Sequence, residues 1–193
     1  MPKLGMEPIR REALVKATIA EIGAAGSLDV TMSRIARRAG VSSGLAHHYF
    51  GGKDDLLVAA MRAILARYGA EVRAALKKAD SPRARLEAII EASFGPEHFE
   101  DETVTAWLQF YLHAQTMPGA RRLLSIYHRR LHANLVHALR PLAGERAGFV
   151  AETLAALIDG LYIRHALGAP GDGLAPEARL RLCLDTLLET NRP

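Results

Sequence analysis

Apolar residues recur three and four positions apart along almost the whole chain, which is the spacing of one face of an α-helix. Alternation with a period of two is rare, and clusters of β-branched residues are few. Glycine and proline interrupt the pattern at regular places, among them Pro8, Gly26, Gly40 and Gly51. The pattern therefore predicts an all-α protein.

These interruptions divide the chain into three short N-terminal helices, one long helix and a larger C-terminal set. The expected helices cover about 8–25, 31–39, 43–50, 53–79, 82–94, 102–116, 119–140, 146–167 and 175–190. An extended loop is expected at 95–101 and a flexible linker at 168–173. We therefore expect a three-helix domain over 1–52 and a helical domain over 53–193.

Composition limits the compartment and the kind of stabilisation. With 49% hydrophobic residues among 193, the chain has enough apolar material for a core. Its one cysteine, Cys183, excludes an intrachain disulfide and favours a reducing cytoplasm. The polar start lacks a signal peptide, and no run approaches the roughly 20 apolar residues that span a bilayer. A soluble cytoplasmic protein without membrane contact is expected.

Positive charge is concentrated in the first quarter of the chain. Residues 1–53 hold eight Lys and Arg against four acids, which accounts for the whole net charge of +4. A compact basic segment on a neutral body suits a polyanion such as DNA. On charge alone, a solvated basic face explains the excess equally well.

Residues 31–50, TMSRIARRAGVSSGLAHHYF, have the pattern of a helix-turn-helix. Ala36 is small where two helices would cross, and Gly40 stands where the turn requires a positive φ. Thr31 and Ser42 are suited to cap the two short helices. The second helix of such a motif enters the major groove of DNA.

The second of these helices would carry a DNA-reading surface. Ser43, Gly44 and His47 share a face near its start, and His48 lies beside them. Ser43 and His47 would offer donors to phosphates or base edges, as would Tyr49. The rival interpretation is a zinc site at the two histidines. Adjacent residues diverge by about 100° on a helix, so they do not readily share one ion.

The motif T-x3-I-A-R-R-A-G-V-S-x-G-x3-H-Y-F followed by G-K-x-D-L-L resembles the DNA-binding segment of TetR-type repressors. The resemblance implies an all-α homodimer with a helix-turn-helix domain and a C-terminal domain for ligand binding and dimerisation. Gly44, Tyr49 and Lys53 match the family pattern, whereas Leu45 and His47 replace a common Thr and Tyr. Leu45 would instead meet a thymine methyl. The predicted DNA contacts are Thr31, Met32, Ser33, Ser42, Ser43, Gly44, Leu45, His47, His48, Tyr49 and Lys53.

Segments in both halves are also similar to the choline-responsive repressors of bacterial glycine betaine synthesis genes. These segments are MPKLGM, IARRAGVSSG, AWLQFY at 106–111 and ALIDGLYIRHAL at 156–167. The resemblance implies a repressor of those genes that choline releases from double-stranded operator DNA. A TetR-type repressor with another effector, and a small-molecule carrier without specific DNA binding, are the alternatives.

Aromatic residues of the C-terminal half would form the effector site. Choline is a quaternary ammonium ion, which binds best over aromatic faces with a carboxylate nearby. A cage of Trp107, Tyr111 and Tyr162 with Asp159 as the charge is the hypothesis, and an ordinary apolar core is the alternative. The predicted ligand-binding residues are Phe94, Trp107, Phe110, Tyr111, Tyr127, Asp159 and Tyr162.

Other features point away from catalysis and metal binding. His128 and His132 have a metal-binding spacing, but no Glu or Cys completes the set, so an exposed polar face is expected. No phosphate loop, nucleophile elbow or pair of catalytic carboxylates occurs, which argues against an enzyme and against a cofactor. The last two helices carry a broader apolar surface, rich in leucine, than the core of one chain can bury. This predicts a homodimer that forms through these helices.

Overall fold

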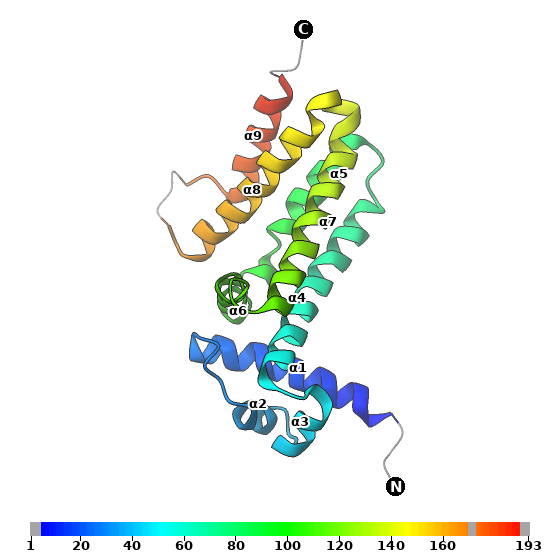
Figure 1. The fold of residues 1–193 in the computed structure, drawn as a ribbon. Helices are drawn as coiled ribbons and strands as arrows, with labels where there is room; N and C mark the ends of the chain where they lie inside the picture. Colours follow the sequence, from blue (N-terminus) through cyan, green and yellow to red (C-terminus); the bar gives the residue numbers. More distant parts are fainter. Residues whose placement is uncertain (1–4, 170–172, 190–193) are drawn as a thin grey trace. The chain divides into compact units, whose positions relative to one another are not determined.

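The computed structural model describes residues 5–169 and 173–189. Its elements are α1 (Met6–Ala25), α2 (Met32–Arg38), α3 (Ser43–Phe50), α4 (Lys53–Leu76), α5 (Pro82–Ser93), the 3-10 turn η1 (Pro96–His98), α6 (Asp101–His113), α7 (Pro118–Ala143), the 3-10 turn η2 (Gly144–Arg146), α8 (Ala147–Ala166) and α9 (Pro176–Glu189). Helices account for every regular element in the described residues, so the all-α prediction is confirmed (Figure 1). Part of the linker predicted at 168–173 lies outside the described residues.

Several helix boundaries differ from the sequence-based expectation, among them the end of α4 at Leu76 instead of 79 and the end of α6 at His113 instead of 116. The helix expected to stop at residue 140 continues through Pro141 to Ala143. Pro141 is exposed, and it comes so near the helix end that its missing N–H removes one hydrogen bond where water can replace it. The loop expected at 95–101 contains the turn Pro96–His98, and α6 begins already at Asp101.

The chain divides into two compact units, and the division runs through α4 and α7. Unit 1 comprises Met1–Ala66 and Glu100–Leu124, and unit 2 comprises Arg67–Phe99 and Ser125–Pro193. The functional division into 1–52 and 53–193 stays a prediction, because the unit with the short helices also includes α6.

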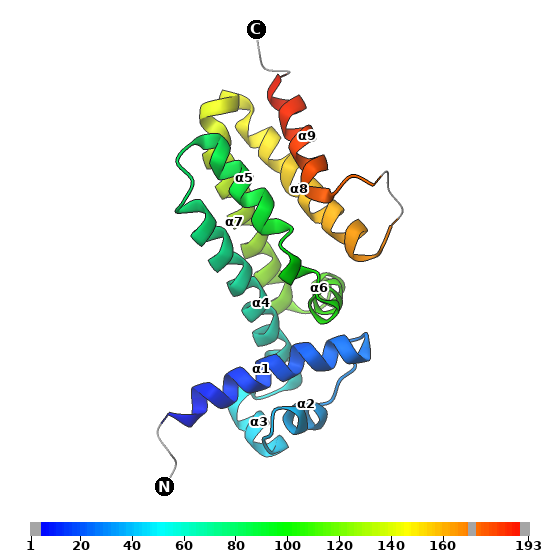
Figure 2. The ribbon, with the colours of Figure 1, turned by 180° about the vertical axis from the view of Figure 1, so that it is seen from behind.

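Unit 1 packs α2 against both α1 and α3, and α6 against α1. Figures 1 and 2 show α2 and α3 on one side of α1 in both views. Its core is apolar and includes Leu14, Ile22, Ile35 and Leu56, each with at most 1% of its surface exposed. Ile9 is 59% exposed, because the first turns of α1 extend beyond this core.

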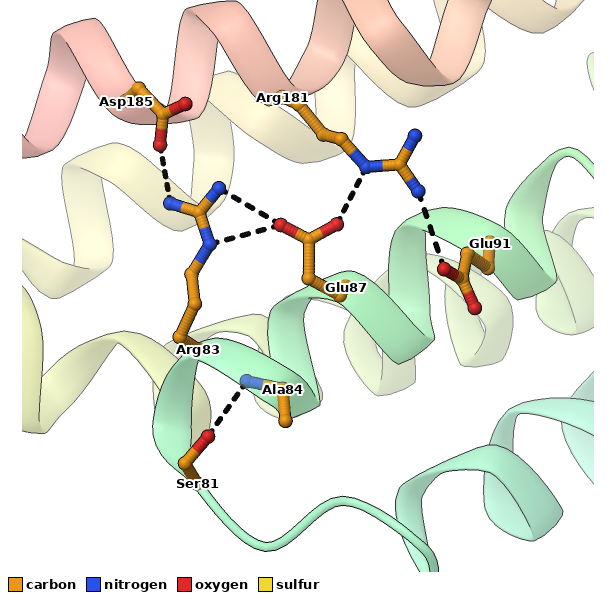
Figure 3. A network of polar contacts seen from close by, with 7 residues as sticks. All are labelled: Ser81, Arg83, Ala84, Glu87, Glu91, Arg181 and Asp185. Atoms are coloured by element: carbon orange, nitrogen blue, oxygen red, sulfur yellow. Dashed lines mark hydrogen bonds and ion pairs between the residues drawn. The ribbon is translucent and has the colours of Figure 1, made fainter.

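Unit 2 is a helical bundle that buries a separate core. This core joins α4, α5, α7, α8 and α9 through residues such as Leu86, Leu135, Leu154 and Leu184. A chain of ion pairs links α5 to α9 across the surface of this unit (Figure 3). No helix of the described residues is long and apolar enough to cross a membrane.

Candidate functional site

The turn between α2 and α3 has the geometry that the helix-turn-helix pattern predicts. Gly40 has a φ of +68°, in the left-handed region that favours glycine. The N–H of Val41 donates to the carbonyl of Ala36 at 3.0 Å, and the N–H of Gly40 donates to that of Arg37 at 3.1 Å. Ala36 is 1% exposed, so a larger side chain at this position would push the two helices apart. The predicted roles of Ala36 and Gly40 are therefore confirmed.

Both predicted caps are formed by side-chain hydroxyls. Thr31 Oγ1 accepts from the N–H of Arg34 at 3.2 Å, and Ser42 Oγ accepts from the N–H of Leu45 at 3.2 Å. Each hydroxyl keeps its own proton for a further partner. A cap of this kind can therefore hold its helix and still donate to a phosphate.

The residues predicted to contact DNA are mostly accessible. Ser33 and Ser43, from α2 and α3, approach each other at 3.5 Å between their Oγ atoms. Met32 differs from the rest: its side chain is 7% exposed and belongs to the core of unit 1, so only its backbone is left for DNA. The exposed residues are Thr31, Ser33, Ser42, Gly44, His47 and His48, and the half-buried ones are Ser43, Leu45, Tyr49 and Lys53.

Arg11 of α1 fixes the end of α3, a role that the sequence analysis missed. Its guanidinium lies 5.0 Å from the ring centre of Tyr49 and 5.3 Å from that of Phe50. It also donates a hydrogen bond to the carbonyl oxygen of Tyr49. Cation–π contacts of this kind stabilise by about 0.5–1 kcal/mol at accessible sites. Sequence alone gives no signal for this contact, because Arg11 and Tyr49 are 38 positions apart.

Glu21 lies on the buried face of α1, and its carboxylate binds two arginines of α2. Its Oε1 accepts from Arg38 Nε at 2.7 Å, and its Oε2 lies 2.9 Å from Arg34 Nη2. The hydrogen bond from Arg38 lowers the pKa of Glu21, with the nearby charges of Arg34 and Arg38 acting in the same direction against desolvation. Two of the eight basic residues in the first quarter are thus engaged by this one carboxylate.

Unit 2 holds a polar and aromatic cluster around Asp159 of α8. Tyr127 of α7 donates its hydroxyl proton to Asp159 Oδ1 at 2.9 Å. The neighbouring His128 places Nε2 at 3.3 Å from Oδ2 of the same carboxylate. The sequence analysis proposed Tyr127 and Asp159 for one site, and the structure brings them into direct contact.

Tyr68 of α4 packs edge-on against Tyr127, with ring centres 5.7 Å apart. Its hydroxyl lies 3.0 Å from Ser93 Oγ. Burial raises the pKa of Tyr68 to about 12, while the bond to Ser93 opposes this and the negative charges of Asp159 and Glu71 add to it. Both carboxylates therefore act on one buried aromatic side chain. The sequence analysis did not assign Tyr68 to a site.

His98 joins the turn η1 to this cluster. Its Nε2 lies 2.8 Å from Glu71 Oε2, and its ring meets Tyr68 edge-on at 5.6 Å. Tyr162 donates to the carbonyl oxygen of His98 at 2.9 Å, and burial raises the pKa of Tyr162 to about 12. Phe99 packs against Tyr162 with ring centres 5.1 Å apart. Glu71 and His98 are the residues that the sequence analysis missed, because neither belongs to an aromatic or apolar pattern.

The remaining predicted effector residues lie elsewhere. Trp107, Phe110 and Tyr111 are in α6 of unit 1, where Trp107 meets Tyr111 edge-on at 5.3 Å. Phe110 is 2% exposed and lines a small apolar pocket of unit 1 together with Ile22, Leu57 and Met117. Phe94, at the end of α5, packs against the core of unit 2.

Metal binding finds no support among the residues that the structure describes, where no group of three or more His, Cys, Asp or Glu side chains could hold an ion. His132, which the sequence places four residues after His128, faces Glu152 instead of sharing a partner with it, at 3.8 Å between Nε2 and Oε2. The two histidines thus pair with different carboxylates of α8.

Both halves of the chain match families of bacterial regulators. Residues 14–60 match the model of bacterial regulatory proteins of the tetR family, and residues 82–191 match that of the BetI-type transcriptional repressor C-terminal domain. A relative from Brucella anthropi, the HTH-type transcriptional regulator BetI, is 55% identical over 91% of this chain and 91% of its own length.

Solved structures share the fold. A transcriptional regulator from Pseudomonas aeruginosa PAO1 superposes with a TM-score of 0.82 at 29% identity, over 95% of this chain and 90% of that one. A regulator from Saccharomonospora viridis, solved in complex with choline, has a TM-score of 0.77 at 24% identity, over 94% of this chain and 96% of that one. The relatives are transcriptional regulators, so the expectation of a non-enzyme is confirmed. With its helix-turn-helix geometry and a C-terminal match over 82–191, the chain belongs to the BetI-type transcriptional repressors of the TetR family.

Proposed function

We propose that this repressor controls glycine betaine synthesis genes as a homodimer and leaves its operator when choline binds. The BetI names of its relatives support the gene target, and the choline complex of the Saccharomonospora viridis regulator supports the effector. Choline acts if it binds more tightly to a dimer state in which the two α3 helices are wrongly spaced for successive major-groove sites.

The observation that carries the effector proposal is the pair of carboxylates beside the buried ring of Tyr68. Tyr127 packs against Tyr68 and donates to Asp159, and His98 packs against the same ring and lies 2.8 Å from Glu71. Choline has no N–H to donate, and its charge is recognised by aromatic faces and carboxylates. Tyr68, Tyr127 and Tyr162 would supply the aromatic part of such a site in unit 2, and Phe94, which packs against the core of the same unit, is proposed with them on the sequence argument.

Trp107, Phe110 and Tyr111 are proposed as further effector contacts on the sequence argument. Trp107 is 8% exposed, so its removal would also disturb the packing of α6. Trp107→Phe preserves an aromatic face and most of the volume. We expect this variant to bind operator DNA normally and to respond more weakly to choline, and an unchanged response would exclude Trp107 from the site.

Dimerisation is proposed through α8 and α9. Leu154, Ile158 and Leu184 face the core of unit 2, whereas Leu182 of α9 is 59% exposed and Phe149 of α8 is 64% exposed. Apolar surface beyond the needs of one core favours a partner. A monomer in light scattering at micromolar concentration would contradict this proposal.

The decisive experiment titrates the complex of the protein with DNA from upstream of its own gene, followed by fluorescence anisotropy. The titrants are choline and 3,3-dimethylbutan-1-ol, a neutral alcohol of the same shape in which carbon replaces the nitrogen. We expect choline to release the DNA at roughly tenfold or more lower concentration than the alcohol, since the difference measures recognition of the charge.

Asp159→Asn should remove most of this preference for choline and leave operator binding without effector intact. Glu152→Gln is the matched control, because Glu152 also lies on α8 and faces a histidine of α7, His132. Equal release by both titrants in the unaltered protein would favour the alternative of a different, apolar effector. Absence of any salt-sensitive DNA binding would favour the carrier without specific DNA binding.

A further inference from the structure

The side chain of His47, on the exposed surface of α3, is held by the main chain. Its Nδ1 lies 3.0 Å from the carbonyl oxygen of Gly51. A carbonyl oxygen accepts hydrogen bonds and cannot donate them, so Nδ1 must carry the proton. The ring is therefore fixed as the Nδ1–H tautomer when it is neutral, and its Nε2 is then an acceptor.

The end of α3 creates this arrangement. Gly51 has a φ of +75°, a backbone conformation that residues with a side chain rarely adopt. Its N–H donates to the carbonyl oxygen of His47 at 2.7 Å, while its own carbonyl accepts from the ring of the same residue. His47 and Gly51 are thus joined twice, and the ring orientation follows from the turn.

This geometry changes what His47 offers to DNA. Phosphate oxygens, and N7 and O6 of guanine, only accept hydrogen bonds. Neutral His47 has its only ring proton committed to Gly51, so it has no donor left for these groups. Protonation supplies a second donor at Nε2 without disturbing the first.

We propose that operator binding takes up one proton at the His47 of each subunit, whose imidazolium donates Nδ1–H to Gly51 and Nε2–H to an acceptor on the DNA. This inference rests on the proposed contact of α3 with the operator. The phosphates favour the charged form of a neighbouring imidazole, so binding and protonation strengthen each other. His47 then becomes a residue that links operator affinity to pH in the range where histidine titrates, around pH 6.5.

The charged and titratable neighbours of this end of α3 come from three helices. On α3 itself, the ring of His48 lies 5.7 Å from that of Tyr49. Asp55 of α4 has its Oδ2 at 3.4 Å from the position of a Cβ on Gly51. The charged and titratable side chains at this end of α3 are Arg11 from α1, His48 and Tyr49 from α3, and Lys53, Asp54 and Asp55 at the start of α4. Of these side chains, only His48 is also an imidazole.

Operator affinity measured by anisotropy between pH 6 and pH 8 tests the proposal. The unaltered protein should bind more tightly as the pH falls, by at most about tenfold per pH unit for each proton, and so by at most about a hundredfold for the two His47 side chains of a dimer. His47→Gln supplies an amide donor that does not titrate, so its affinity should lose most of this dependence. His48→Gln, which changes the adjacent residue in the same way, should keep it. An unchanged pH dependence in the His47 variant would overturn the proposal.

A second measurement needs no DNA. Nitrogen-15 NMR of the free protein above pH 8 should show His47 protonated at Nδ1, and a proton at Nε2 would also overturn the proposal. The two hypotheses fail differently. Loss of specific operator binding at every pH contradicts the proposed function and this inference together, whereas pH-independent specific binding contradicts the inference alone.

Discussion

Glu21 of α1 and Arg38 of α2 form a hydrogen bond of 2.7 Å inside the DNA-binding unit, with the Glu21 side chain only 10% exposed. The same carboxylate lies 2.9 Å from Arg34. Since α2 packs between α1 and α3, this contact sets the position of α2 on which the recognition helix rests. Two arginines of the basic N-terminal segment thus pair with the carboxylate of Glu21 inside the protein.

Glu21→Gln should destabilise the protein. The loss of charged hydrogen bonds costs about 1–2 kcal/mol of unfolding free energy, which lowers Tm by roughly 2–6 °C in circular dichroism melts. Glu12→Gln is the control on the same helix, since its partner Lys16 is 73% exposed, and its Tm should hardly move. An equal fall in Tm for both variants would contradict a special role of Glu21.

The pH dependence of this contribution follows from the lowered pKa of Glu21. The folded state binds the proton less tightly than the unfolded state does. The contribution is therefore present above the pKa of an unfolded glutamate, near 4.3, and is lost as the pH falls through the lower folded value. The stability difference between the unaltered protein and Glu21→Gln should accordingly shrink below about pH 4.

Arg38 and Lys53 should differ in how they affect binding to DNA. Arg38 is engaged by Glu21, whereas Lys53 reaches only a main-chain carbonyl, that of Leu28, at 3.4 Å. Lys53→Gln should reduce the slope of log affinity against log salt by about 0.9 for each subunit, and so by about 1.8 for a dimer that loses two phosphate contacts. Arg38→Gln should lower Tm and leave that slope unchanged. A smaller slope for Arg38→Gln would mean that this arginine also meets a phosphate.

The sequence predicted the helix-turn-helix correctly because its determinants are local. Thr31, Ser42 and Gly40 act on residues within five positions, through caps and a turn, and their chemistry is specific to those roles. The same holds for the all-α class, which follows from periodicity alone.

Contacts between distant segments escaped prediction. Nothing in the sequence pattern links Glu21 with Arg38. The contact of Glu71 with His98 joins a helix to a segment that was expected to be an irregular loop. For the effector residues, the pattern identified aromatic faces but not their partners. Periodicity shows which side of a helix is apolar, whereas the choice of neighbour depends on how helices cross.

Glu87 of α5 should matter more than Glu91, one turn further along the helix. Glu87 accepts from Arg181 of α9 at 2.6 Å and from Arg83 at 2.9 Å, while Glu91 meets only Arg181, at 3.4 Å (Figure 3). Glu87→Gln should cost about 1–2 kcal/mol of unfolding free energy, and Glu91→Gln less than about 0.5 kcal/mol. If α9 forms the dimer interface, the dimer of the Glu87 variant should also dissociate at a higher protein concentration than the unaltered dimer does. Equal effects on Tm would contradict this ranking.

Tyr68 and Tyr162 should lose their phenolic protons at a higher pH than an ordinary tyrosine does. Burial raises the pKa of each to about 12, so the folded state holds both phenolic protons more tightly than the unfolded chain does. Their contribution to stability is present below about pH 10 and is lost as the pH rises toward 12. Absorbance at 295 nm should show two phenols ionising in that range or only on unfolding. Tyr68→Phe and Tyr162→Phe should each remove one of them, and five tyrosines titrating together near pH 10 would contradict the prediction.

Gly23 is a position where α1 and α6 approach each other closely within unit 1. A Cβ on Gly23 would lie 2.7 Å from Cα, Cβ and Cγ of Glu102, too close without movement of the α6 backbone. Gly23→Ala should therefore cost about 1–3 kcal/mol of unfolding free energy, although alanine favours helices. It should also weaken the neighbouring hydrogen bond from Gln109 Nε2 to the carbonyl oxygen of Gly26, which is 3.2 Å long. Gly148→Ala is the matched control in α8, where a Cβ meets nothing within 4 Å, and it should raise Tm slightly. A rise in Tm for both variants would mean that α6 moves aside at little cost and that its contact with α1 is loose.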